Sequence, residues 1–202
     1  MLARFFQWSS YLFHPLLLLW YMALWYAYCW PSAMSPLKGL YAVIYVGFYV
    51  VLLPLMFVLL LVWNRLIPNW HMPLAQHRQW PLLMLSVLLS YALAHGLQIH
   101  QVGTLYFFYL ATLGSLLTAT LASFWKRKPS LHSMALGGCL GYVWGLLQHQ
   151  PGERTLDFIL LLLLSGWVCS ARLFQQAHSP KELIQGFAMG LIPAILLYPF
   201  WL

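Results

Sequence analysis

The chain has 202 residues, of which 62% are apolar and only 6% are charged, and its mean hydropathy is +0.76. This composition excludes a soluble globular domain and a disordered tail, and it indicates a membrane protein. Ten Lys and Arg residues against three Asp and Glu residues give a formal net charge of +7. Because so apolar a chain has no basic arm that would bind nucleic acid, the basic excess indicates anionic membrane lipid as the partner.

Seven apolar runs approach the length of about 20 residues that crosses a bilayer. They are separated by proline and glycine, and they lack the alternating pattern of a membrane β-barrel. The runs cover residues 9–30, 39–63, 80–98, 103–124, 133–149, 155–171 and 183–201. We therefore predict an all-α membrane bundle of six to seven transmembrane helices, with residues 1–202 forming one domain and the N-terminal segment retained as the first span.

The three cysteines add nothing to this prediction. Cys29, Cys139 and Cys169 lie in apolar runs, and their spacing suits neither a zinc site nor a disulfide framework.

Seven spans place the N-terminus and the segments 64–79, 125–132 and 172–182 on one side of the membrane. Eight of the ten cations lie on that side, and the positive-inside bias would make it cytoplasmic. If three of them serve catalysis, however, the remaining bias is five against two, so the side stays open. The eight are Arg4, Arg65, Arg78, Lys126, Arg127, Lys128, Arg172 and Lys181, and the other two are Lys38 and Arg154.

Three segments on the crowded side repeat one theme, a cation near a hydroxyl or an imidazole where a span begins. They read Q-H-R-Q-W-P at 76–81, W-K-R-K-P-S-L-H at 125–132 and S-A-R-L-F-Q-Q-A-H-S-P-K-E at 170–182. Arginine matches phosphate oxygens with paired donors, so this set is typical of phosphate chemistry.

These segments resemble the type 2 phosphatidic acid phosphatases (PAP2), which share their site with the vanadium haloperoxidases. The pattern of that family is K-x6-R-P, then P-S-G-H, then S-R-x5-H-x3-D. Here the second element has Leu131 in place of Gly, and the third has Ala171 between Ser and Arg and Glu182 in place of Asp. The first element is the least complete, because two residues separate Arg78 from proline and His71 stands where the family has Lys. The resemblance covers about residues 78–190 and is closest to a membrane-bound bacterial branch.

The resemblance implies a role for each residue and requires no metal or cofactor. His178 would be the nucleophile that takes the phosphoryl group, Glu182 would orient its ring, and His132 would protonate the leaving oxygen. It also implies a multi-pass protein of the bacterial inner membrane. The phosphoryl oxygens would be held by Arg78, Lys128, Ser130 and Arg172.

Two observations on the residues are independent of the family. His178 and Glu182 are four apart, so a helix places them on one face. Glycines also follow each histidine at four-residue spacing, which permits close helix packing in lipid and predicts that the two helices bring His132 and His178 to one pocket. These glycines are Gly137, Gly141 and Gly145 after the first histidine, and Gly186 and Gly190 after the second.

Some of these residues also have a simpler interpretation. Glu182 completes a capping box with Ser179, and its carboxylate can serve the cap and the imidazole together. Arg172 and Lys181 also lie where cations that flank a span reach the lipid headgroups and act as anchors. We assign structural or interfacial roles to His14, His95, His100 and His149, and leave His71 and His77 unassigned.

The first functional hypothesis is a membrane phosphatase acting on a lipid phosphate or a lipid diphosphate. The alternative is a catalytically degenerate relative that binds anionic lipid or scaffolds membrane partners, because the motifs depart from the family pattern. A transporter or a cofactor-binding bundle would place its ionisable residues near the midplane, whereas these charges gather at one surface. The sequence does not choose the lipid or indicate an oligomeric state.

Overall fold

The structure is a computed structural model, and it describes residues 2–29, 34–69, 72, 74–149 and 154–201. Every regular element in these ranges is a helix and none is a strand, which confirms the predicted all-α class. The elements are α1 (Leu2–Leu12), α2 (Pro15–Cys29), α3 (Pro36–Val46), the π-helix η1 (Gly47–Leu52), α4 (Leu53–Trp63), the 3₁₀-helix η2 (Ala75–Arg78), α5 (Gln79–His95), α6 (Ile99–Val102), α7 (Leu105–Phe124), α8 (Leu131–His149), α9 (Thr155–Phe174), α10 (Pro180–Leu197) and the 3₁₀-helix η3 (Tyr198–Phe200).

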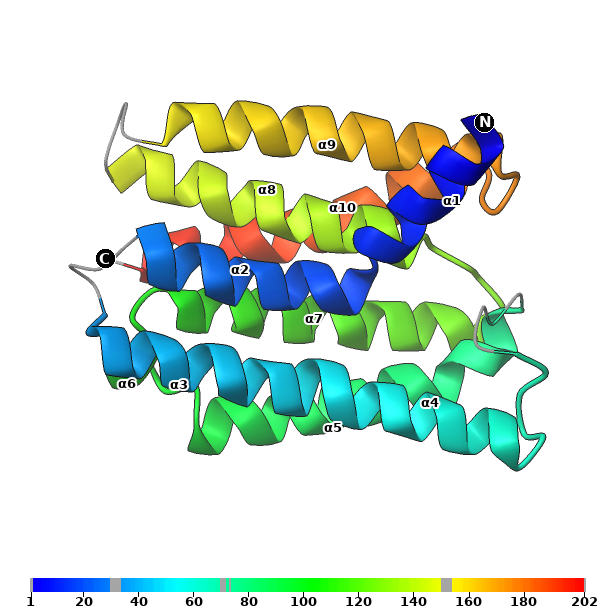
Figure 1. Cartoon of the computed structure of the whole chain (residues 1–202), viewed down its shortest axis with the longest axis horizontal. Coiled ribbons are helices and arrows are strands. Elements are labelled where there is room, and N and C mark those ends of the chain that lie inside the picture. Colours follow the sequence, from blue (N-terminus) through cyan, green and yellow to red (C-terminus); the bar gives the residue numbers. More distant parts are fainter. Residues whose placement is uncertain (1, 30–33, 70–71, 73, 150–153, 202) are drawn as a thin grey trace. The chain divides into compact units, whose positions relative to one another are not determined.

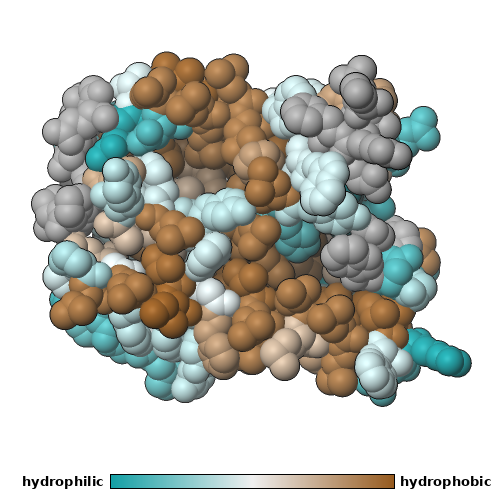
Figure 2. All heavy atoms as spheres, viewed as in Figure 1, coloured by the Kyte–Doolittle hydropathy of each residue, from teal (hydrophilic) through white to brown (hydrophobic). Residues whose placement is uncertain are grey.

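Four helical segments are long and apolar enough to cross a membrane, namely Pro36–Trp63, Leu105–Phe124, Thr155–Phe174 and Pro180–Phe200. Many large apolar side chains on these segments are exposed, and residues of high hydropathy cover much of the face shown in Figure 2. Exposed apolar surface of this extent suits lipid better than water. The protein is therefore a membrane protein, and the count of six to seven passes stays a prediction.

Several span boundaries differ by a few residues from those predicted, and two of the differences are caused by proline. The predicted span 9–30 is interrupted at Phe13 and His14, since Pro15 suits the first position of a new helix and cannot continue α1. The predicted span 39–63 begins earlier, at Pro36. There Ser35 is the N-cap, and its hydroxyl oxygen lies 3.4 Å from the backbone nitrogen of Lys38, which donates to it.

The contacts divide the chain into two compact units. Unit 1 comprises Met1–Leu19 and Pro129–Leu202, and unit 2 comprises Trp20–Lys128. In unit 2, α5 packs on α7, and the Gln79 side-chain amide donates to the Ser123 carbonyl oxygen over 3.2 Å, which ties the start of α5 to the end of α7. The prediction of a single domain over residues 1–202 stays a prediction.

In unit 1, α8 and α10 run parallel in close contact (Figure 1). A Cβ atom on Gly186 or Gly190 would overlap the backbone of α8 or of the residue before it, and one on Gly137 would overlap the backbone of α10. This confirms the predicted packing of the two glycine stripes. The connecting helix α9 runs back beside α8, and α1 packs on α9. The beginnings of α8 and α10 and the last turn of α9 therefore lie at the same end of unit 1.

Candidate functional site

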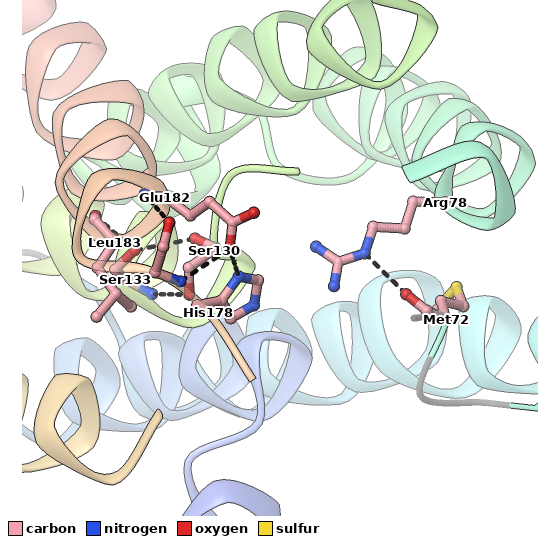
Figure 3. Close-up of polar contacts among 8 residues, drawn as sticks. Met72, Arg78, Ser130, Ser133, His178, Glu182 and Leu183 are labelled. Carbon is pink, nitrogen blue, oxygen red and sulfur yellow. Dashed lines mark hydrogen bonds and ion pairs between the residues drawn. The ribbon is translucent and has the colours of Figure 1, made fainter. Parts of the chain in front are cut away.

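His178 and Glu182 are in direct contact at the start of α10. The His178 Nδ1 atom lies 2.9 Å from Glu182 Oε2, and the imidazole side chain is buried (Figure 3). The same carboxylate oxygen accepts the backbone N–H of Ser179 over 3.1 Å, and the Ser179 hydroxyl accepts the backbone N–H of Glu182 over 3.3 Å. The carboxylate thus contacts the helix cap and the imidazole together, which is one of the alternatives that the sequence left open.

This contact fixes the tautomer of a neutral His178 ring. An ionised carboxylate only accepts, so Nδ1 carries the hydrogen and the lone pair of the ring is on Nε2. A negative charge at Nδ1 also stabilises the cation that forms when Nε2 gains a substituent. The arrangement suits a nucleophile that reacts through Nε2.

The start of α8 is tied to the start of α10 by backbone and hydroxyl contacts. The Ser130 N–H donates to the Glu182 carbonyl oxygen over 3.0 Å, and the Ser133 hydroxyl donates to the Leu183 carbonyl oxygen over 2.9 Å (Figure 3). Ser130 is fully buried, and its hydroxyl oxygen lies 3.5 Å from the backbone nitrogen of Ser133, the geometry of a weak N-cap. Its predicted contact with a phosphoryl oxygen stays a prediction.

His132 is the second residue of α8 and precedes the predicted span 133–149. Its Nε2–H donates to the Ser10 carbonyl oxygen over 3.2 Å, and its ring meets the His14 ring edge-on with the centroids 5.9 Å apart. Burial lowers the pKa of His132 well below its usual value, the Arg172 charge lowers it further, and His14 and His178 act in the same direction. The lowered pKa favours the neutral form of the His132 ring.

Arg172 lies in the last turn of α9 and is half-buried. Its Nη1 donates to the Gln175 side-chain oxygen over 3.2 Å, and its Nε is buried without a hydrogen-bond partner among the described residues. Within the same ranges, no ion pair joins it to a carboxylate. A half-buried guanidinium without a carboxylate partner favours an anionic ligand, because its donors gain most from a charged acceptor.

The other two predicted phosphate ligands belong to unit 2. Arg78 ends η2 and is 7% exposed, and its Nε donates to the Met72 carbonyl oxygen over 3.2 Å (Figure 3). Lys128 is the last residue of unit 2 and is half-buried. Because both lie in the other unit, their part in the site stays a prediction. His71 lies outside the described residues.

Sequence reasoning missed three residues around this cluster. Ser10 acts through its main-chain carbonyl, for which no side-chain pattern gives a signal, and we had assigned His14 a structural or interfacial role. Gln175 lies within the five-residue spacer between Arg172 and His178. A polar Gln-Gln pair next to the apolar end of a span was a signal that could have indicated it.

A comparison with protein families supplies independent evidence. The model of the PAP2 superfamily matches residues 82–202, more than half of the chain. The chain belongs to the PAP2 superfamily. The match covers the second and third motif segments of this PAP2 protein and begins after Arg78, in agreement with the incomplete first segment. Neither the search of the curated proteins nor the search of the solved structures found a match. Membership suggests phosphatase activity.

Proposed function

We propose that this PAP2 protein hydrolyses a lipid phosphate or a lipid diphosphate through a phosphohistidine intermediate. The observation that carries the proposal is the 2.9 Å contact of His178 Nδ1 with Glu182, because it prepares Nε2 as a nucleophile. His132 and the guanidinium of Arg172 at the same end of unit 1 add a proton donor and an anion ligand.

In the first step the lone pair on His178 Nε2 attacks phosphorus, and the bond between phosphorus and the lipid oxygen breaks. His132 gives its proton to that oxygen, which releases a lipid alcohol, or a lipid monophosphate if the substrate is a diphosphate. In the second step His132 takes a proton from water as the water oxygen attacks phosphorus. The bond between phosphorus and nitrogen then breaks, inorganic phosphate leaves, and both imidazoles return to their starting forms.

The proton that His132 transfers resides on Nδ1, because Nε2–H already donates to the Ser10 carbonyl. The ring has to be an imidazolium to donate, whereas burial and the Arg172 charge lower its pKa without substrate. A phosphoryl anion bound between Arg172 and His132 reverses the sign of the local charge and raises that pKa. The acid form is thus favoured when substrate is bound.

Membrane lipid is the expected environment of the substrate, which reaches the site from within one leaflet. The predicted loops are short, which suits recognition of the phosphate and the adjoining part of the headgroup. Location in a bacterial inner membrane follows from the resemblance, and so does chemistry without a metal or cofactor.

The test is phosphate release by the purified protein from lipid phosphates and diphosphates in mixed micelles without added metal. We expect His178→Ala to abolish release, and His100→Ala, which changes an exposed ring in α6, to retain it. Substrate carrying ³²P should also leave an acid-labile, alkali-stable label on the wild type that His178→Ala lacks. A folded protein that hydrolyses no lipid of the panel and yet binds anionic vesicles would support the degenerate alternative instead.

A further inference from the structure

We infer that Gln175 is a positioning residue, which holds the Arg172 guanidinium in place by linking it to α1. The inference rests on the proposed function of the site. It concerns contacts inside unit 1, and α1 lies outside the residues that match the family.

The side-chain amide of Gln175 links a hydrogen-bond donor on Arg172 to hydrogen-bond acceptors in α1. Its oxygen accepts Arg172 Nη1–H over 3.2 Å, while its nitrogen donates to the Phe6 carbonyl oxygen over 2.7 Å and to the Ser10 hydroxyl over 3.1 Å. A carbonyl oxygen only accepts and a guanidinium only donates, so the amide has one orientation that satisfies both. Gln175 therefore cannot flip without losing its partners.

The α1 end of this link is itself held in place. The Phe6 ring packs on α9, with its centroid 5.2 Å from that of Trp167 and 4.9 Å from that of Phe174. Ser10 is buried, and its main-chain carbonyl accepts His132 Nε2–H. One stretch of α1 thus supports Arg172 through Gln175 and His132 directly.

Arginine has a long flexible side chain, and ordering it costs conformational entropy. Arg172 forms no ion pair with a carboxylate among the described residues, so the Gln175 amide is the contact that limits its rotamers. Nη1 is used by Gln175, and the remaining N–H groups are then presented to an anion in a fixed direction. Loss of the Gln175 amide therefore leaves the positive charge of Arg172 in place but removes the contact that orients its guanidinium.

The first test is Gln175→Ala with Gln176→Asn as the matched control. Gln176 is exposed and has a left-handed φ of 53°, which Asn adopts readily. We expect Gln175→Ala to lower kcat/KM for a lipid phosphate by roughly 10-fold or more, the effect of losing one hydrogen bond to a charged group, and the control to match the wild type. Gln175→Asn is the second variant, for use if Gln175→Ala folds poorly. It keeps the amide but shortens the side chain by one methylene, so the amide no longer reaches its partners and we expect the same loss of kcat/KM.

A double-mutant cycle separates positioning from a general structural effect. If Gln175 acts through Arg172, then Gln175→Ala should cause no further loss of kcat/KM in the Arg172→Ala background. Equal losses in both backgrounds would overturn the inference.

Binding of inorganic phosphate, measured as a rise in melting temperature, tests the inference without turnover. We expect the rise in the wild type and in Gln176→Asn, and its loss in Gln175→Ala and Arg172→Ala. The same pattern in a protein that hydrolyses nothing would support the positioning role while the proposed function fails. An active wild type with unchanged kcat/KM and phosphate binding in Gln175→Ala would overturn the positioning role while the proposed function stands.

Discussion

Gly186→Ala tests whether the close approach of α8 and α10 assembles the site. A Cβ atom at residue 186 would lie 2.5 Å from the Ser133 hydroxyl oxygen, 3.0 Å from the Ser130 nitrogen and within overlap of the Ser130 carbonyl oxygen. Two of these neighbours are backbone atoms, which cannot rotate away. The methyl group therefore has to push the start of α10 away from the start of α8.

The cost of this displacement has two parts. Overpacking a close contact typically costs about 1–3 kcal/mol. Displacement also stretches the hydrogen bond from Ser130 to the Glu182 carbonyl and that from Ser133 to the Leu183 carbonyl, each contributing about 0.5–1.5 kcal/mol. We therefore expect Gly186→Ala to lower the free energy of unfolding by roughly 2–6 kcal/mol. Activity should fall by about 100-fold, because an active site tolerates little displacement.

The assay is thermal unfolding in detergent combined with phosphate release, and Gly166→Ala is the matched control. A Cβ atom on Gly166 in α9 meets nothing within 4 Å, so alanine there should raise stability by about 0.5–1 kcal/mol through helix propensity and leave activity intact. Unchanged unfolding and activity in Gly186→Ala, or equal destabilisation by both substitutions, would refute the reasoning.

Three further predictions concern single groups and the topology. Glu182→Gln keeps an acceptor for the cap but not the charge next to His178, so we expect phosphate release to fall by about 100-fold or more with little change in melting temperature, and full activity would contradict the role of the carboxylate. Because the pKa of His132 is lower in the folded state than in the unfolded state, the unfolded state binds more protons on acidification. We therefore expect stability to fall as the pH drops below about 6.5 and this loss to shrink in His132→Asn, measured by thermal unfolding; an equal loss in both would contradict it. The predicted span 183–201 places a reporter fused after residue 202 on the side opposite residue 181, whose side is found by labelling Lys181→Cys with an impermeant thiol reagent. Finding both on the same side would contradict a membrane crossing by this segment.

The helices of this protein were predictable because long apolar runs and prolines leave few alternatives. The run that became α7, predicted as 103–124, differs from Leu105–Phe124 by two residues at its start. The break at His14 was missed because the run continues through it in composition, although Pro15 was a local signal. The close packing of α8 and α10 was predicted from glycine spacing alone, since four-residue spacing places small residues on one helix face.

The contacts of the candidate site also differ in whether the sequence could predict them. The contact of His178 with Glu182 follows from local spacing, so the sequence predicts it. The contacts of Ser10 with His132 and of Gln175 with Phe6 join segments more than one hundred residues apart in the sequence through main-chain carbonyls. Every residue has a carbonyl, so such contacts have no signature in a single sequence.

Two departures from the family pattern bear on whether this PAP2 protein is active or degenerate. Leu131 stands in place of Gly at the start of α8 and does not have a positive φ, so the backbone there accepts any L-residue. Glu182 is one methylene longer than Asp, yet its carboxylate reaches His178 Nδ1 at 2.9 Å because the capping box draws it back toward the residues that precede the helix. Leu131 adds no left-handed backbone conformation, and Glu182 keeps the contact with His178 that the proposed chemistry requires. These two positions therefore favour a hydrolase over a degenerate lipid-binding relative.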